Sequence, residues 1–377
     1  MKFPIFLLKP EPTDLFELNF SYNFCQRYLR KYVSQDIRFI TGEETLSQLN
    51  PASNLIWIVF DPTCVPAKTT KEKLIQAIDL GYDLVCPVAN ESVYDCQRIR
   101  APFVYHDLAT FNELAEFLAK DNQNDLTEVR QLEPYFICLN LKKVPMEIVI
   151  KDIAQLNLKK CVVKNALVHR FKNIFSSPRS DILALIPEQC KTILDLGCGH
   201  GTMGKHLKTL RPYVRITGVE ISPSLAQEAK KYYDQVYVQD LNKTEIKDVF
   251  DLVICGDILE HLYDPWTMIK KIGDLLKENG YFIGSIPNVA HYSILKELLK
   301  GKFEYVPSGL LCVGHIRFFT EESLKRVLGE VGFKVDKWIN QKVEPTPEGK
   351  KFIEQVQAFA NQEQLETISF LFRAQKQ

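Results

Sequence analysis

The segment Ile193–Gly204, which reads ILDLGCGHGTMG, restricts the fold of this chain more than any other part of the sequence. The residues Thr192–Leu194 predict a buried strand that ends at Asp195, and glycines follow at positions 197, 199, 201 and 204. Because glycine has no side chain, the backbone can turn tightly there and come into contact with a ligand. The next residues, Thr202–Leu210, predict a helix whose free N–H groups face the turn and favour a negatively charged group such as a carboxylate. The segment therefore predicts a strand, a turn and a helix that hold a nucleotide-type ligand.

Acidic residues follow the next two predicted strands. The strand Arg215–Val219 leads to Glu220, which lies 19 residues after Gly201 and is placed to accept hydrogen bonds from ribose hydroxyls. The strand Gln235–Val238 is followed by Asp240. Because the carboxyl ends of parallel strands meet at one edge of a sheet, we expect these acids to lie around the glycine turn.

Two classes of enzyme use a turn of this kind. Residues 199–204 fit the G-x-G-x-x-G fingerprint of dinucleotide oxidoreductases, but a bare match of that type is weak. Asp195, two residues ahead of the first glycine, favours another class, as does the acid at position 240. A fourth predicted strand, Phe250–Ile254, then opens into Cys255. This order resembles the class I S-adenosylmethionine-dependent methyltransferases, whose first motif reads like DLGCGHG and whose second-strand acid holds the ribose.

The resemblance covers roughly Asp181–Gln377 and implies a Rossmann-like α/β sheet of seven strands. It also implies S-adenosylmethionine as cofactor. The residues that it implies for cofactor binding are Asp195, Gly197, Cys198, Gly199, Gly201, Glu220, Ile221, Asp240, Leu241 and Cys255.

Length and composition place limits on the protein class. With 377 residues the chain is long enough for two domains. Lysine plus arginine and aspartate plus glutamate balance at 47 each, which argues against a general affinity for nucleic acid. The ten cysteines form no C-x-x-C pair, which is typical of reduced thiols in a cytoplasmic protein. The apolar run at Pro4–Leu8 is too short for a signal peptide or a membrane span, so we expect a soluble protein.

A change in composition at Asn173–Ser180, which reads NIFSSPRS, predicts a linker between two folded units. We therefore expect domains at 1–172 and 181–377, joined by a linker at 173–180. In the second domain a short helix at Asp181–Ile186 precedes the first strand, and Ser222 followed by Pro223 predicts a helix start. The later elements are predicted as a helix at Trp266–Leu276, a strand at Tyr281–Ile286, a helix capped by Thr320, strands at Phe333–Ile339 and Leu365–Phe372, and a charged helix around Gly349–Asn361.

The first 172 residues predict another α/β unit. Its elements are strands at Leu55–Phe60, Asp83–Val88, Tyr135–Leu141, Cys161–Val163 and Ala166–Arg170, and a helix at Thr70–Leu80. The unit resembles a shortened, divergent glycosyltransferase domain of the GT-A type, in which an aspartate pair after a strand holds a divalent metal and a sugar-nucleotide diphosphate. Here the pair reads Asp61-Pro62-Thr63, so one carboxylate is missing. A degenerate domain that binds a glycan or packs against the catalytic half is favoured over active glycosyl transfer.

The segment Gly256–Pro265 carries the candidate reaction chemistry. Asp257, Glu260 and His261 would lie on neighbouring positions if a helical turn begins there, and such groups can remove a proton from an acceptor hydroxyl. The segment resembles the E-x-x-E-H stretch of metal-dependent O-methyltransferases of the ubiquinone-biosynthesis type, with aspartate in place of the first glutamate. The resemblance implies that Asp257, Glu260, His261 and His315 bind Mg²⁺. His261 as a general base alone, or a loop-ordering role for Glu260 and His261, stays open.

The strings PNVAHYSIL, GKFEY and GHIRFFT resemble a subgroup of bacterial methyltransferases associated with glycan assembly. We therefore expect O-methylation of a hydroxyl on a sugar or glycan precursor, with a small-molecule or glycan acceptor as the partner. The alternatives are a bifunctional glycosyltransferase and methyltransferase, a quinone-type small-molecule O-methyltransferase, and a non-catalytic protein that senses the cofactor.

Overall fold

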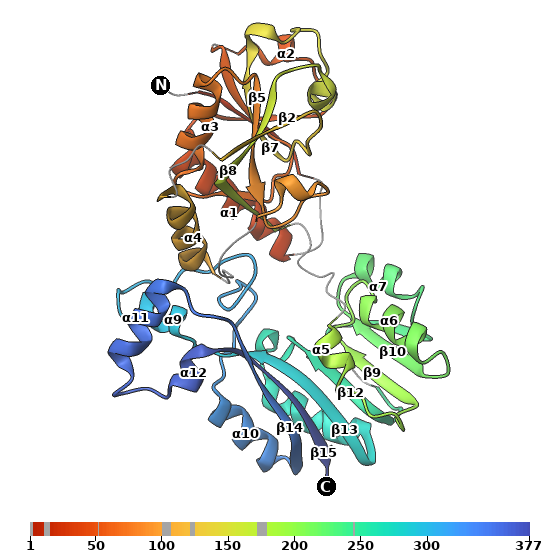
Figure 1. Cartoon of the computed structure of the whole chain (residues 1–377). Helices are drawn as coiled ribbons and strands as arrows, with labels where there is room; N and C mark the ends of the chain where they lie inside the picture. Colours follow the sequence, from red (N-terminus) through yellow and green to blue (C-terminus); the bar gives the residue numbers. More distant parts are fainter. Residues whose placement is uncertain are drawn as a thin grey trace. The chain divides into compact units, whose positions relative to one another are not determined.

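The computed structural model divides into two compact units, Met1–Lys172 and Asn173–Gln377 (Figure 1). It describes residues 3–10, 16–51, 53–99, 107–120, 125–171, 179–243 and 246–377. Most of the expected linker at 173–180 lies outside these ranges. Within them, no helix has the length and apolar character needed to span a membrane.

The N-terminal unit is built on a mixed sheet that has eight strands in the described part of the chain. β7 is antiparallel to β3 and β5, whereas β1 is parallel to β2 and β3, and β8 is parallel to β5. β4 and β6 are antiparallel to β8. The strands are β1 (Ile5–Leu8), β2 (Ile37–Ile40), β3 (Leu55–Val59), β4 (Cys64–Pro66), β5 (Leu84–Ala89), β6 (Leu126–Val129), β7 (Phe136–Asn140) and β8 (Lys160–Arg170).

The sequence predicted part of this unit correctly. The strands β3, β5 and β7 begin or end within a residue or two of the predicted positions. The two short strands expected at 161–163 and 166–170 are one continuous strand, β8. The apolar run near the N-terminus is β1, which is buried between β2 and β3. The helices are α1 (Phe16–Tyr32), α2 (Leu46–Leu49), α3 (Thr70–Asp79) and α4 (Leu108–Lys120), with 3-10 turns η1 (Asp95–Gln97), η2 (Leu141–Lys143) and η3 (Ile150–Gln155).

The C-terminal unit contains a seven-stranded sheet in the order β11-β10-β9-β12-β13-β15-β14. Strands β9 to β13 are parallel to one another, whereas β15 is antiparallel to both β13 and β14. The strands are β9 (Thr192–Leu196), β10 (Arg215–Glu220), β11 (Gln235–Val238), β12 (Phe250–Gly256), β13 (Leu276–Pro287), β14 (Phe333–Lys342) and β15 (Thr367–Lys376). The sheet thus has the seven strands that the sequence predicts, with the last pair at the C-terminus.

Helices of this unit begin where the sequence supplies caps. Ser222 Oγ accepts a hydrogen bond from the Leu225 backbone, with Pro223 as the first helical residue, and Thr320 Oγ1 accepts one from Ser323. The charged helix expected around Gly349–Asn361 is observed as Pro347–Val356. A second, short helix follows it and contains Leu365, a residue expected in a strand. The helices are α5 (Ser180–Leu183), α6 (Thr202–Leu210), α7 (Pro223–Ala229), α8 (Pro265–Leu275), α9 (Tyr292–Leu298), α10 (Glu321–Glu330), α11 (Pro347–Val356) and α12 (Gln362–Glu366), with a 3-10 turn η4 (Leu259–His261).

Apolar clusters cover both faces of this sheet. Neighbouring residues of β9 point to opposite faces, as strand geometry requires: Ile193 packs with residues of α5 and α6, and Leu194 packs with residues of α8 and α10. Because both faces are covered, the carboxyl ends of the parallel strands are the edge at which a ligand is expected to bind.

Candidate active site

A glycine-rich loop connects β9 to α6. Its glycines at 197, 199 and 201 have φ values of 77°, 53° and 80°, a region that other residues rarely adopt. A Cβ atom at Gly197 would overlap the Ile258 side chain, and one at Gly201 would lie 2.7 Å from the Ala229 Cα. Both the backbone conformation and the available space therefore require glycine in this turn.

Glu220 at the end of β10 connects the second strand to the glycine loop. Its side chain is buried, with Oε2 accepting a hydrogen bond from the Gly199 backbone at 2.9 Å and Oε1 accepting one from the Ser222 backbone at 2.9 Å. Each carboxylate oxygen has further acceptor capacity after these bonds. Glu220 is thus held in a fixed position at the strand edge, where it can accept hydrogen bonds from the hydroxyls of a ribose.

Asp195 lies near the end of β9, just before the glycine-rich loop, and is 3% exposed. Burial raises its pKa to about 7, and the nearby Glu220 adds to this, whereas a 2.5 Å hydrogen bond from the Tyr233 hydroxyl and the charge of Arg179 oppose it. The Tyr233 ring also packs where Gly204 and Gly218 leave room. Sequence reasoning missed Tyr233, because no local pattern joins it to a residue 38 positions away.

The raised pKa of Asp195 predicts an unusual dependence of stability on pH. At pH values between about 4, the ordinary pKa of an aspartate, and about 7, the folded protein keeps a proton that the unfolded chain releases. Asp195 therefore destabilises the fold increasingly as the pH rises through this range, and its effect is constant at higher pH. Replacing Asp195→Asn removes the effect. Between pH 5 and pH 8, wild type should therefore lose about 3 kcal/mol of unfolding free energy relative to the variant. Urea unfolding of both proteins across this range measures it, and parallel stability curves would contradict the assignment.

The other residues predicted for cofactor binding lie at or near the same strand edge. Cys198 and Cys255 are buried, and burial raises the pKa of both thiols, so they are neutral packing groups. Ile221 after β10 is 67% exposed. Asp240 after β11 accepts hydrogen bonds from Asn242, which order the turn leading to Leu241.

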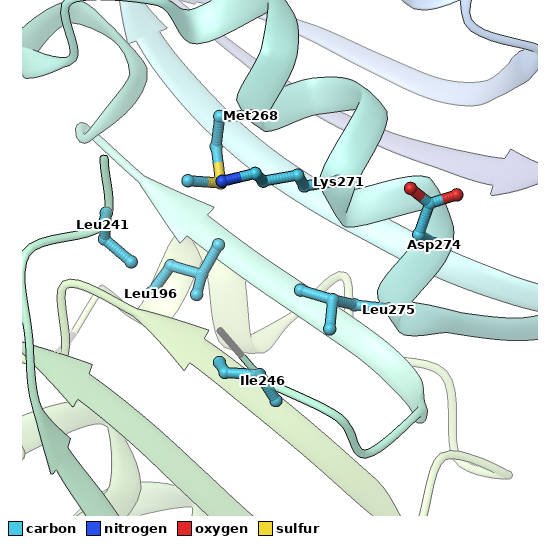
Figure 2. Close-up of a pocket in the computed structure, with 7 residues that line it drawn as sticks. All are labelled: Leu196, Leu241, Ile246, Met268, Lys271, Asp274 and Leu275. Atoms are coloured by element: carbon cyan, nitrogen blue, oxygen red, sulfur yellow. The ribbon is translucent and has the colours of Figure 1, made fainter. Parts of the chain in front are cut away.

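A cavity of about 260 Å³ lies between β9, α8 and the segment after β11 (Figure 2). Most of its walls are apolar, and Lys271 and Asp274 add charge. Leu241, which the sequence predicts to bind the cofactor, lines the cavity. The turn after β11 therefore forms one of its walls. The lining consists of Leu196, Leu241, Ile246, Met268, Lys271, Asp274 and Leu275.

Arg179, immediately before α5, is a site residue that sequence reasoning missed. Its guanidinium forms ion pairs with Asp181 and Asp257 and donates a 3.0 Å hydrogen bond to Ser285 Oγ. Burial lowers the pKa of Arg179, but these carboxylates and Glu260 raise it above its ordinary value, so the group stays charged. The sequence placed it in a linker, and a lone arginine beside a proline gives no stronger signal.

Asp257 points toward Arg179 rather than toward the predicted metal ligands. Its φ of 54° is left-handed, and its side chain accepts a 2.7 Å hydrogen bond from Ser285 Oγ in addition to the ion pair. The helical turn expected to include Asp257 is a 3-10 turn that spans only Leu259–His261. The predicted helical spacing of Asp257, Glu260 and His261 is therefore not present.

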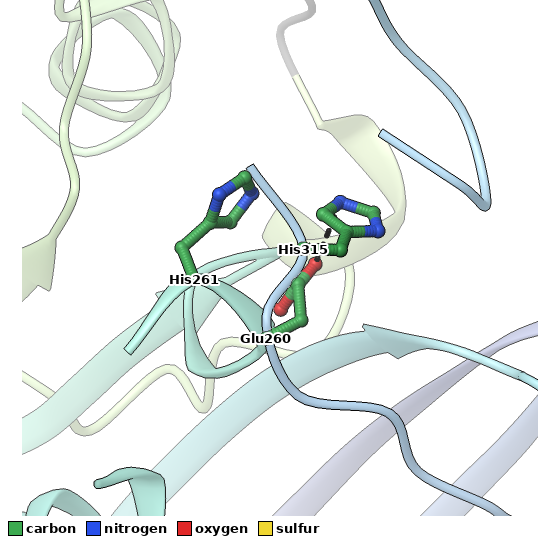
Figure 3. A group of neighbouring side chains, drawn as sticks. All are labelled: Glu260, His261 and His315. Atoms are coloured by element: carbon green, nitrogen blue, oxygen red, sulfur yellow. Dashed lines mark ion pairs between the residues drawn. The ribbon is translucent and has the colours of Figure 1, made fainter. Parts of the chain in front are cut away.

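The structure does bring together Glu260, His261 and His315 (Figure 3). Their ligand atoms lie within 4.8 Å of one another, and His315 Nε2 is 3.9 Å from Glu260 Oε1. Backbone N–H groups of Ile316 and Arg317 donate to the Glu260 carbonyl at 2.9 and 3.0 Å. These bonds hold the segment that carries His315 against η4.

Burial sets the charge states of this group. It raises the pKa of Glu260 well above its ordinary value, and the charge of Asp257 adds to the rise. Burial lowers the pKa of His261, although Asp257 and a hydrogen bond with the Gly314 backbone oppose this. His261 is therefore a neutral imidazole at neutral pH and can accept a proton.

The single aspartate expected as a metal ligand in the N-terminal unit is neutralised. Asp61, beyond the end of β3, forms a 2.8 Å ion pair with Arg170, which is buried and also pairs with Glu133 at 2.8 Å. The Thr63 hydroxyl donates to the same Asp61 carboxylate. A guanidinium thus occupies the place where the resemblance implies a divalent cation.

A glycine loop and a strand-end acid at the open edge of a covered sheet define an enzyme domain that binds a nucleotide-type cofactor. Residues 168–337 match the family model described as a methyltransferase domain. Over 128 residues the chain is 31% identical to the ubiquinone biosynthesis O-methyltransferase of Coxiella burnetii, covering 32% of this chain and 54% of that protein. It is 26% identical over 188 residues to the trans-aconitate 2-methyltransferase of Escherichia coli, covering 48% and 73%.

Among solved structures, the N-methyltransferase NodS from Bradyrhizobium japonicum, in complex with S-adenosyl-L-homocysteine, is similar at 15% identity and a TM-score of 0.36, covering 52% of this chain and 84% of NodS. On the sequence matches, the chain contains a class I S-adenosylmethionine-dependent methyltransferase domain. It spans about half the length of the ubiquinone biosynthesis enzymes that it matches, so the activity of the whole protein is a proposal.

Proposed function

We propose that the protein transfers a methyl group from S-adenosylmethionine to a hydroxyl of a sugar or glycan precursor. The observation that carries the proposal is the hydrogen bond from the Gly199 backbone to Glu220, which fixes against the glycine loop the acid that we propose binds the ribose. The loop is formed by glycines that no larger residue can replace, which fits a cofactor lying against the backbone.

The residues present fit this cofactor. Glu220 would accept hydrogen bonds from its ribose hydroxyls. The remaining predicted residues would surround it from β9 to β12: Asp195, Gly197, Cys198, Gly201, Ile221, Asp240, Leu241 and Cys255. When bound, the cofactor supplies a methyl group attached to a positively charged sulfonium. This charge already activates the methyl group for in-line transfer.

The protein has to orient the acceptor and remove its proton. In this proposal His261 accepts the proton from the acceptor hydroxyl, because its lowered pKa keeps it neutral. Asp257, whose charge raises the pKa of His261, stabilises the imidazolium that forms. Glu260 lies beside the imidazoles of His261 and His315 and is the third group of this proposed catalytic set. The Mg²⁺ that the resemblance implies fits poorly, because it prefers oxygen ligands and the group contains one carboxylate.

A sugar acceptor is supported by aromatic side chains on the segments next to this group. Phe303, Tyr305 and Phe318 are each about two-fifths exposed, and the Phe303 ring contacts the other two rings edge to face. Exposed ring faces of this kind can pack against the apolar face of a sugar. Phe319, the neighbour of Phe318 in the sequence, is buried in the core.

Specific observations bear on two alternative functions, a second glycosyltransferase activity and a quinone-type acceptor. The ion pair between Asp61 and Arg170 disfavours a second, glycosyltransferase activity, because it removes the carboxylate that a metal would need. The likeness to ubiquinone biosynthesis O-methyltransferases favours a quinone-type acceptor as the second candidate. We also propose a cytoplasmic location, since the ten cysteines are thiols.

Transfer of labelled methyl groups tests the proposal. The purified protein is incubated with methyl-labelled S-adenosylmethionine and separated fractions of a cell extract that contain sugar nucleotides, lipid-linked glycans or quinone precursors. We expect label in a carbohydrate fraction as a base-stable ether. Label in the quinone fraction would replace the sugar by the second candidate, and label lost in mild base would indicate a carboxylate acceptor instead of a hydroxyl. Absence of label in every fraction would favour a non-catalytic, cofactor-sensing role.

A further inference from the structure

Arg317 is a fixed cation at the start of α8. Its Nη1 and Nη2 groups donate hydrogen bonds to the carbonyls of Ile316 and Tyr263 at 3.0 and 2.6 Å, and its Cζ lies 5.9 Å from the centre of the Trp266 ring. Each of these two nitrogens carries a second N–H group. Arg317 is half-buried, whereas Tyr263 and Trp266 are 73% and 48% exposed, so the surroundings of the guanidinium are open to solvent.

No carboxylate forms an ion pair with Arg317 among the residues that the structure describes. Asp264 is the nearby acid, and its oxygens accept hydrogen bonds from the Thr267 backbone and hydroxyl at 3.0 and 2.7 Å, as the cap of α8. These bonds lower the pKa of Asp264, and the charge of Arg317 contributes less to the same effect. The Arg317 guanidinium therefore keeps a positive charge and N–H donors that are available to an anion.

The segment that carries Arg317 also carries parts of the candidate active site. The Arg317 backbone donates a 3.0 Å hydrogen bond to the Glu260 carbonyl, and the His315 ring centre lies 4.8 Å from that of His261. Phe318, the next residue, belongs to the exposed rings that we propose pack against the sugar. A group bound by Arg317 can therefore belong to the same molecule as the acceptor hydroxyl.

From these contacts we infer that Arg317 binds an oxyanion, a phosphate or carboxylate group that the acceptor carries, and so selects an anionic acceptor. The inference rests on the proposed function, because it takes the oxyanion to belong to the molecule that is methylated. A guanidinium offers paired N–H donors that match two oxygens of a phosphate or a carboxylate. The two carbonyls and the Trp266 ring hold the side chain in place before the acceptor binds, which reduces the entropic cost of binding.

The charge of the methylated product is the first test. The product labelled from S-adenosylmethionine is passed over an anion-exchange column at pH 8, before and after treatment with a phosphatase. We expect the column to retain the product. Retention that the phosphatase abolishes identifies a phosphate ester, and retention that survives the treatment identifies a carboxylate. A labelled product that the column does not retain would overturn the inference.

Variants of Arg317 assign the selection to this residue. Arg317→Gln should raise KM for the labelled acceptor about 10- to 100-fold and change kcat much less, because the lost contacts are made with a group remote from the transferred proton. Arg317→Lys keeps the charge but loses the paired donors, so its KM should lie between those of wild type and Arg317→Gln. A KM that stays at the wild-type value in Arg317→Gln would contradict the assignment.

Arg211→Gln is the matched control. Arg211, at the end of α6 and just before β10 begins, also donates to two carbonyls, those of Pro187 and Ile186 at 2.9 and 3.0 Å. It lies at the amino end of the parallel strands, so its replacement should leave KM unchanged. Thermal unfolding of each variant is compared with wild type. Equal rises of KM in Arg211→Gln and Arg317→Gln would indicate a general loss of structure and would overturn the inference.

Anion binding without turnover separates this inference from the proposed function. Wild type and Arg317→Gln are titrated by calorimetry with glucose 1-phosphate, glucuronate and glucose at constant ionic strength. We expect wild type to bind one of the two anions with a dissociation constant of about 1 mM, and Arg317→Gln and glucose to show at least about tenfold weaker binding. If no fraction of the extract is methylated, Arg317-dependent anion binding would preserve this site and reject the methyltransferase proposal alone. Methyl transfer to an uncharged acceptor would reject this inference alone, and the absence of both methyl transfer and anion binding would reject both.

Discussion

Replacement of Glu220→Ala is expected to lower the affinity for S-adenosylmethionine by about 10²- to 10⁴-fold. In the proposed site the carboxylate accepts hydrogen bonds from two ribose hydroxyls, and a hydrogen bond to a charged group contributes about 1.5–3 kcal/mol. Two such bonds correspond to roughly two to four factors of ten in the dissociation constant. Calorimetric titration of the variant with the cofactor measures the loss.

The control must show that the loss comes from the ribose contacts. Glu220 also ties the Gly199 and Ser222 backbones together, so thermal unfolding of the variant is compared with wild type. Glu330→Ala, at the exposed end of α10, removes a glutamate that has no contact with the glycine loop and should leave the affinity unchanged. An unchanged affinity in Glu220→Ala would reject the cofactor site proposed here.

Replacement of His261→Ala is expected to reduce kcat of the metal-free protein by about 10²- to 10⁴-fold, the usual range for loss of a general base. Cofactor affinity should stay the same, because His261 acts on the acceptor. Wild-type activity should fall as pH decreases through the pKa of His261, which burial places below its ordinary value of 6.5, since the protonated imidazole cannot accept a proton. The variant should lack this dependence.

Single-turnover rates between pH 5 and pH 8, measured in EDTA, test both statements. His206→Ala serves as the control, because His206 is an exposed residue of α6 that contacts the Thr202 carbonyl. A variant with wild-type turnover would exclude His261 as the base. Turnover that disappears in EDTA and returns with a divalent metal ion would move the role from the free imidazole to the metal-bound state.

Local signals in the sequence predicted much of the methyltransferase unit. The helix at Thr202–Leu210 and the strand at Gln235–Val238 have the predicted bounds, because an apolar period and clear turn residues define each of them. The start of the strand expected at Tyr281–Ile286 was less well predicted. β13 begins at Leu276 and continues through Asn279, whose left-handed φ of 59° turns the chain without ending the strand.

Pairing between distant segments limited the prediction of the N-terminal unit. The run Ile5–Leu8 is only four residues long, and its role depends on β2 and β3, which pair with it from some 30 and 50 residues away. A short apolar segment alone does not show whether it is a strand or which strands it joins.

The candidate site shows the same difference between contacts that local sequence signals predict and contacts that depend on tertiary packing. The approach of Glu220 to the glycine loop follows from two adjacent parallel strands, so sequence reasoning could place it. The hydrogen bond from Tyr233 to Asp195 and the diversion of Asp257 by Arg179 depend on tertiary packing, and on a left-handed residue that the sequence pattern does not signal. For the same reason the expected four-residue metal set lacks Asp257 in the structure.

The position of Arg179 has a practical consequence for dissecting the protein. A truncated form that starts at residue 181, the domain boundary that the sequence suggests, would omit the guanidinium that pairs with Asp257 and Asp181. Such a fragment would keep the whole sheet yet leave both carboxylates without their cation. Expression of the C-terminal unit by itself should therefore begin no later than Asn173, where the compact unit starts.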